Sequence, residues 1–255
     1  MSVFVDLALA VDPAQFARRA ALEPDDWQAD LLCSDARQAI LLCARQTGKS
    51  TTSAVLATHE AEYRPGSLVL LLSPSLRQSQ ELFRKVRDVR AALSVAAFPV
   101  AEESALRLEL VNGSRIICLP GSEQTIRGYS GVRLLVVDEA SRVPDELYQA
   151  VRPMLAVSGG RLVLLSTPFG RRGFFYHEWM EGGSTWQRVR ITARECPRIP
   201  PDWLEAERAT IGEWWFKQEY ECEFVETLDQ IFGFDLIQRA LKDDVHLLWE
   251  GDGGL

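Results

Sequence analysis

The sequence predicts an α/β fold in which a mostly parallel β-sheet is flanked by helices. The first observation is a set of short apolar runs that are typical of strands buried on both faces. These runs are residues 39–42, 68–72, 134–137 and 162–165. The second is that segments of helical character separate the runs, as in βαβ units. The third is a loop containing Gly48, Lys49 and Ser50 that directly follows the first run.

Helices account for most of the remaining chain before residue 195. We expect residues 1–38 to form a helical lead-in. We expect further helices at residues 51–63, at residues 76–93, and from near Pro144 to a point before Ser158.

A hairpin and a second, helical region complete the expected organisation. Two short strands, at residues 107–110 and 115–119, flank Asn112-Gly113, the strongest hairpin signal in the chain. After about residue 195 the sequence becomes helical and rich in aromatic residues, which predicts a small subdomain packed against the sheet. The predicted units are residues 1–195, 196–230 and 231–255.

The segment Cys43-Ala44-Arg45-Gln46-Thr47-Gly48-Lys49-Ser50 is a phosphate-binding loop of unusual spelling. In the pattern G-x-x-x-x-G-K-[ST], backbone N–H groups cradle phosphates, the lysine reaches the β and γ oxygens, and the hydroxyl holds Mg²⁺. Cys43 replaces the first glycine, and Arg45 adds a positive charge. The next helix directs its positive end at the anion. The residues expected to bind ATP here are Arg45, Gln46, Thr47, Gly48, Lys49, Ser50 and Thr51.

An acidic pair ends a later strand. In Leu134-Leu135-Val136-Val137-Asp138-Glu139-Ala140, the apolar run delivers both carboxylates at its carboxyl end, as in a Walker B motif. Asp138 would then hold Mg²⁺ together with Ser50, and Glu139 would orient and deprotonate the attacking water. Loop and acidic pair together predict a Mg²⁺-dependent NTPase.

Two weaker signals accompany these motifs. The next buried strand runs into Ser166-Thr167-Pro168, where ligands of such sheets bind, so these residues could report hydrolysis to the rest of the protein. Upstream, Trp27-Gln28 offers an aromatic ring and an amide suited to the adenine base.

Composition excludes several other classes of function. The chain is 47% hydrophobic and 25% charged, and it contains no apolar stretch long enough to span a bilayer, so we expect a cytoplasmic protein. Its five cysteines form no C-x-x-C pair, which argues against a zinc site. A net charge of −8 argues against a basic DNA-binding module.

Together these motifs resemble the N-terminal ATPase domain of the large terminase subunit of tailed bacteriophages, the DNA-packaging motor. The matching motifs are A-R-Q-T-G-K-S, W-Q, V-V-D-E-A and S-T-P, together with T-I-R-G-Y-S-G at 125–131 and Q-E-Y-E-C-E-F at 218–224. The resemblance implies a P-loop NTPase fold of the RecA-like ASCE type. It also implies that residues 1–195 carry the adenine-binding segment, that 196–230 are a helical lid, and that 231–255 lead toward a nuclease domain.

The resemblance also implies roles and partners. Arg45 would contact the γ-phosphate in cis, and Arg127 would act in trans as an arginine finger, with Arg142 as the second choice. The partners would be double-stranded DNA, a portal protein, a small terminase subunit and further copies of the chain in a ring of five. The acidic cluster of a two-metal nuclease is lacking, so we expect no nuclease activity.

Two other functions remain open from the residues alone. A helicase-like or other nucleic-acid-translocating P-loop ATPase would share the same motifs, although a two-lobed helicase needs a second lobe. A nucleotide-dependent scaffold would bind ATP without hydrolysing it, but such a scaffold would have no need of Glu139 as a general base.

Overall fold

The computed structural model describes residues 3–93, 98–121, 126 and 128–226. Its α-helices are α1 (Val3–Val11), α2 (Pro13–Arg19), α3 (Asp26–Cys33), α4 (Lys49–Tyr63), α5 (Leu76–Leu93), α7 (Asp145–Val151), α8 (Gly173–Glu181), α9 (Pro201–Ile211) and α10 (Glu213–Glu219). Its strands are β1 (Gln38–Cys43), β2 (Leu68–Ser73), β3 (Val100–Glu103), β4 (Arg107–Leu110), β5 (Arg115–Pro120), β6 (Val132–Asp138), β7 (Arg161–Ser166) and β8 (Gln187–Ile191). Short 3₁₀ turns occur at η2 (Ala140–Arg142), η3 (Arg152–Leu155) and η4 (Ala193–Glu195).

The strands form one eight-stranded sheet in the order β3-β4-β5-β2-β6-β7-β1-β8. Along this order, neighbouring strands from β5 to β8 pair in parallel. The β3–β4 and β4–β5 pairs are antiparallel. Strand β7 lies between β1, which precedes the phosphate loop, and β6, which ends in the acidic pair. This is the RecA-like P-loop arrangement expected from the sequence.

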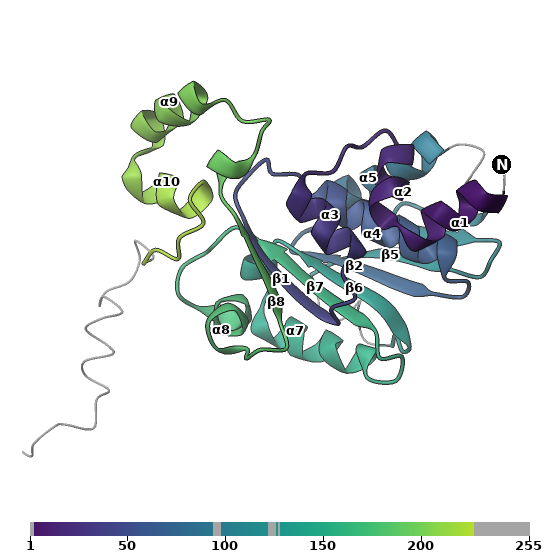
Figure 1. Ribbon diagram of the computed structural model, residues 1–255. Coiled ribbons are helices and arrows are strands. Elements are labelled where there is room, and N and C mark those ends of the chain that lie inside the picture. The colour runs from purple at the N-terminus through teal and green to yellow at the C-terminus, as the bar shows by residue number, and fades with distance from the viewer. Residues whose placement is uncertain (1–2, 94–97, 122–125, 127, 227–255) are drawn as a thin grey trace, which may run out of the picture.

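Helices cover both faces of the sheet because side chains alternate along the buried strands. In β1, Leu41 joins the core beneath α1–α5, whereas Ile40 and Leu42 join the core beneath α7 and α8. Figure 1 shows these two helical layers, with α9 and α10 beyond one end of the sheet. We refer to α9 and α10 as the helical lid; Leu204 and Phe216 anchor it in the second core.

The predicted elements are confirmed with small shifts in their ends. The hairpin around Asn112-Gly113 is formed by β4 and β5. The helix expected after Pro144 is shorter, since α7 ends at Val151 and a 3₁₀ turn containing Pro153 follows. Proline lacks the N–H that would continue an α-helix.

Among the described strands and α-helices, three were not predicted: β3, β8 and α8. Strand β8 has the sequence Gln-Arg-Val-Arg-Ile and is mostly half-buried at the edge of the sheet, so it has no apolar run to reveal it. Strand β3 is exposed at the opposite edge. Among the described residues, no helix is long and apolar enough to cross a membrane.

Candidate active site

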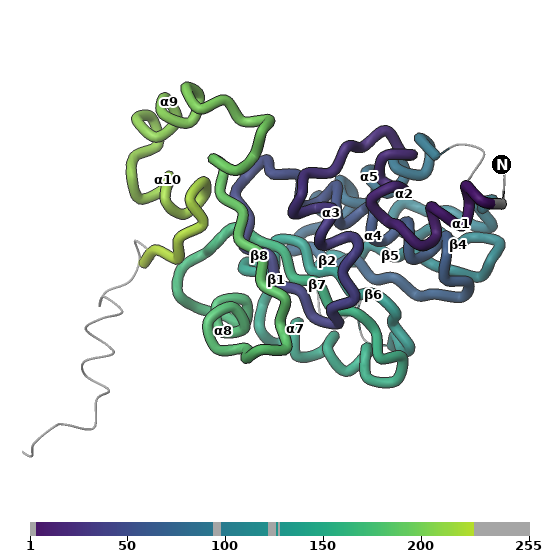
Figure 2. The backbone as a smooth tube through the Cα atoms, viewed as in Figure 1, coloured from purple at the N-terminus to yellow at the C-terminus, as the bar shows by residue number. Residues whose placement is uncertain are grey.

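The phosphate loop leaves β1 at the carboxyl edge of the sheet. Because β1 and β8 are parallel and Cys43 lies opposite Ile191, both strands end at this edge (Figure 2). The loop is fastened there by backbone bonds from Ala44 N to Ile191 O, at 2.8 Å, and from Arg45 N to Glu219 O, at 3.0 Å. The lid therefore contacts the phosphate loop directly.

The missing first glycine has a structural explanation. Cys43 is the last residue of β1 and is fully buried in the core, where its side chain has room. Positive φ angles occur later in the loop, at Gln46 (63°) and Gly48 (93°). The φ of Gly48 is one that residues with a Cβ rarely adopt, and a Cβ atom there would also lie 2.7 Å from the Gln28 amide nitrogen, so glycine is favoured at this position.

Ser50 and Asp138 meet as the sequence predicts. The Ser50 hydroxyl donates to Asp138 Oδ2 at 3.0 Å, and Asp138 is only 6% exposed. Burial raises the pKa of Asp138 to about 6, with the neighbouring Glu139 charge adding to the effect. Hydroxyl and carboxylate oxygens beside a phosphate loop are ligands that fit Mg²⁺, which favours one or two carboxylates plus substrate phosphates.

Replacing Asp138 with asparagine is expected to raise the Tm of the nucleotide-free protein near neutral pH. Because the pKa is raised in the folded state from 3.8 to about 6, the folded protein binds more protons than the unfolded chain between these values. Stability therefore falls as the pH rises through this window, by on the order of 2–3 kcal/mol. Asparagine carries no charge, so the variant avoids this loss of folding stability.

Thermal unfolding in EDTA, near pH 7.5 and near pH 4.5, checks this expectation. The gain in Tm from Asp138→Asn should be present near pH 7.5. It should be largely absent near pH 4.5, because the Asp138 carboxylate of the folded wild-type protein is then protonated and, like asparagine, uncharged. An equal gain at both pH values would contradict the electrostatic explanation.

Glu139 is turned toward the pocket by an unusual backbone. Its φ of 52° is left-handed, a conformation that costs energy for a residue other than glycine and is common at functional sites. Ser166 Oγ donates to Glu139 Oε2 at 3.5 Å, and Ser141 Oγ lies 2.6 Å from Ser166 Oγ. Ser141 also donates to the Thr167 carbonyl at 2.9 Å. The end of β7 is thus joined to the acidic pair, and the buried Pro168 follows.

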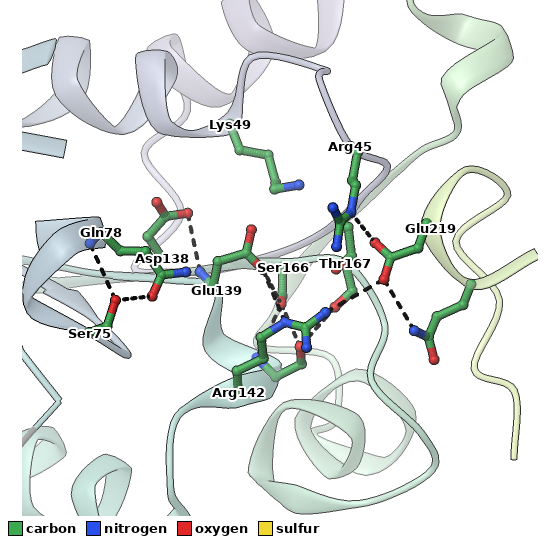
Figure 3. Close-up of polar contacts among 12 residues, drawn as sticks. Arg45, Lys49, Ser75, Gln78, Asp138, Glu139, Arg142, Ser166, Thr167 and Glu219 are labelled. Atoms are coloured by element: carbon green, nitrogen blue, oxygen red, sulfur yellow. Dashed lines mark hydrogen bonds and ion pairs between the residues drawn. The ribbon is translucent and has the colours of Figure 1, made fainter. Parts of the chain in front are cut away.

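Glu219 belongs to the motif Q-E-Y-E-C-E-F, but no role for it was predicted from the sequence. It is 5% exposed and comes from the last turn of α10. Arg45 Nε donates to its Oε2 at 2.5 Å, and Arg142 Nη2 lies 3.5 Å from its Oε1. Figure 3 shows both guanidinium groups converging on this carboxylate. Hydrogen bonding to Glu219 raises the pKa of Arg45.

The phosphate loop lines a cavity of about 470 Å³. Its other walls come from Glu139 and Arg142 after β6, Thr167 after β7, and Gln78 and Lys85 of α5. Lys85 Nζ donates to Thr51 Oγ1 at 3.3 Å. Gln78 and Lys85 were not predicted as site residues, because they lie on a helix whose charged face is also explained by solvent exposure.

A smaller cavity of about 250 Å³ adjoins the first at Gly48 and Thr51. Its walls include the apolar side chains of Leu22, Pro24 and Val55, with Gln28 among its polar groups. The Gln28 amide donates to Thr52 Oγ1 at 2.9 Å and accepts from Asp25 N at 2.8 Å. This cavity is a candidate site for a nucleotide base, because it adjoins the phosphate loop and combines apolar walls with the Gln28 amide.

Arg198 lines the smaller cavity, whereas Trp27 does not. Arg198, which was not predicted, pairs with both Asp25 oxygens at 2.7 Å and donates to Thr47 O at 3.1 Å. Trp27 is not brought to either cavity: it lies in the core beneath α1–α5 and is 8% exposed. Arg127 and residues 231–255 lie outside the described residues.

Comparison with known proteins shows the family to which this chain belongs. Residues 40–239 match the family model described as "Terminase large subunit, T4likevirus-type, N-terminal". The chain belongs to this terminase family. A large terminase subunit of Thermus phage G20c is 26% identical over 260 residues, covering 88% of this chain and 53% of that protein. The chain thus spans about half the length of the curated terminases it matches.

Solved terminase structures share the fold. The large terminase ATPase domain of Thermus phage P74-26 aligns with a TM-score of 0.73 at 24% identity, covering 83% of this chain and 98% of that domain. The large terminase of the thermophilic bacteriophage D6E, solved with ATP-γ-S, aligns with a TM-score of 0.61 at 13% identity. That alignment covers 78% of this chain and 52% of the D6E protein.

Proposed function

We propose that this terminase chain hydrolyses Mg²⁺-ATP and that hydrolysis drives double-stranded DNA into a procapsid. The observation that carries the proposal is the Ser50–Asp138 hydrogen bond, with Glu139 beside it on the wall of the phosphate-loop cavity. The D6E terminase solved with ATP-γ-S supports nucleotide binding at this kind of fold.

Each side chain then has a chemical task. Lys49, and Arg45 if released from Glu219, would bind the phosphate oxygens. Ser50 and Asp138 would hold Mg²⁺, which neutralises charge on the phosphates when bound. Glu139 would accept a proton from the attacking water. Gln28 would contact the base, and Trp27 would support it from the core.

The coupling residues lie where such a signal can leave the site. Ser166 contacts Glu139 through its hydroxyl, and Ser141 joins it to the Thr167 carbonyl. A change in the position of Glu139 during hydrolysis would reach β7 and the Pro168 turn through these bonds. We propose that Ser166, Thr167 and Pro168 transmit hydrolysis in this way.

The motor itself would be assembled from several copies. We propose a ring of five chains on a portal protein, supplied with DNA by a small terminase subunit, with Arg127 of one copy completing the site of the next. An arginine finger is worth about 10³–10⁵ in the rate of NTP hydrolysis. Hydrolysis should therefore depend on protein concentration.

The test is steady-state ATP hydrolysis across a range of protein concentrations, with and without double-stranded DNA. Specific activity should rise with concentration, and Arg127→Ala should abolish the rise. Mixing Arg127→Ala with Glu139→Gln should restore part of the activity, because one interface in the mixture then holds both native residues. A wild-type chain that binds ATP but does not hydrolyse it would instead support the scaffold function.

A further inference from the structure

Arg142 stands where three parts of the site meet. It ends η2, the short turn that follows the acidic pair, and its side chain is 30% exposed. Its Nε lies 3.9 Å from Glu139 Oε2, and its Nη2 lies 3.5 Å from Glu219 Oε1. Its guanidinium carbon is 4.4 Å from the centre of the Phe169 ring. One side chain thus contacts the proposed general base, the lid and the chain beyond Pro168. Figure 3 shows Arg142 between Glu139 and Glu219.

The charges around Arg142 explain why an arginine suits this position. The Glu219 side chain is 7% exposed, and a carboxylate so buried requires cationic partners. Arg45 binds one of its oxygens and Arg142 faces the other. A planar guanidinium with five N–H donors can serve two carboxylates while its face rests on an aromatic ring. A lysine ammonium has the charge but not this geometry.

The turn that bears Arg142 is firmly attached to the sheet. The backbone N–H of the adjacent Ser141 donates to Ser166 Oγ at 3.2 Å, and the Ser141 hydroxyl donates to the Thr167 carbonyl at 2.9 Å. The base of the Arg142 side chain is therefore held by the core, whereas its far end is paired with the lid. A displacement of α10 would change how the guanidinium is shared between Glu219 and Glu139.

We infer that Arg142 is a positioning residue that holds the Glu139 carboxylate within its own subunit and links it to the lid through Glu219. The inference rests on the proposed ATPase function and deepens it, because it makes the general base sensitive to the position of the lid. It also assigns Arg142 a role in cis, since the guanidinium lies in the cavity of its own chain, and leaves the trans role to Arg127.

The test compares ATP hydrolysis by Arg142→Ala, Arg142→Lys and the wild-type chain. Arg142→Ala should lower kcat by about tenfold or more, with KM changed by no more than about twofold, because the base is mispositioned while ATP is still bound. Arg142→Lys should recover part of kcat. Arg152→Ala is the matched control, because Arg152 pairs with Glu178 outside the cavity and should leave kcat unchanged.

Two further measurements isolate the link to the lid and the cis role. Arg142→Ala combined with Glu219→Gln should be no slower than the slower single variant, since both changes break the same link. Mixing Arg142→Ala with Glu139→Gln should give no recovery, in contrast to the mixture made with Arg127→Ala.

Several outcomes would overturn the inference. These are an unchanged kcat in Arg142→Ala, a defect confined to KM, an additive double variant, or recovery on mixing. A wild-type chain without ATP hydrolysis would defeat the proposed function as a whole. Hydrolysis that needs Glu139 but not Arg142 would defeat only this inference. Thermal unfolding of both Arg142 variants separates loss of folding from loss of kcat.

Discussion

Replacing Glu139 with glutamine is expected to lower kcat for ATP hydrolysis by about 10²–10⁴-fold while ATP binding persists. Glutamine keeps the size of the side chain and can still accept from Ser166, but it cannot take a proton from water. Binding should survive because Lys49 and Ser50 are unaffected. Steady-state hydrolysis and calorimetric ATP binding, measured on the same preparation, check both parts.

Glu146→Gln is the matched control for this variant. Glu146 is exposed in the first turn of α7 and does not line the cavity, so its replacement should leave kcat within about twofold, as is usual for surface positions. If Glu139→Gln retained a tenth or more of the wild-type kcat, Glu139 would not be the general base. The scaffold function or another base would then have to be considered.

Replacing Lys49 with alanine is expected to weaken ATP binding by about 100-fold and to make hydrolysis undetectable. The Lys49 side chain is buried, and its Nζ donates to the carbonyls of Cys43 and Ala44 at 3.2 and 3.0 Å, so the ammonium group lies within the phosphate loop. Charge-assisted hydrogen bonds contribute about 1.5–3 kcal/mol each, which corresponds to this loss. Calorimetry with ATP and Mg²⁺ measures the change in Kd.

Lys85→Ala provides the comparison within the same cavity. Lys85 carries the same charge but reaches the loop from α5, where its Nζ bonds to Thr51 Oγ1. We expect its loss to weaken ATP binding by no more than about tenfold, because solvent screens the charge at this half-exposed position and exposed ionic interactions contribute about 1 kcal/mol or less. Equal losses in the two variants would argue against a special role for Lys49.

The elements with strong local signals were predicted almost to the residue. Strand β2 and helix α5 lie where the apolar run and the helical segment indicated. The edge strand β8 was missed because it is stabilised by pairing with β1, and its own sequence carries alternating arginines that do not resemble a buried strand. Pairing of this kind depends on a partner distant in the sequence.

The candidate site also contains some residues whose positions were predictable from the sequence and others whose positions were not. The meeting of Ser50 with Asp138 was predictable, because parallel strands bring their carboxyl ends to one edge of the sheet. The position of Trp27 was less predictable. Its indole packs in the core, and of the two motif residues only Gln28 lines the smaller cavity. Adjacent residues of a helix point in different directions, so a two-residue motif could not place both side chains at the base.

The sequence by itself determined the strands and helices with strong local signals, the phosphate loop and the acidic pair, because each depends on residues close together in the chain. Tertiary structure decided which charges face one another. Glu219 reaches Arg45 across 174 positions of sequence and Arg142 from the other side, because the lid returns the chain to the end of β1. Such ion pairs depend on burial and distance, and both arise only when the sheet, the loop and the lid have packed together.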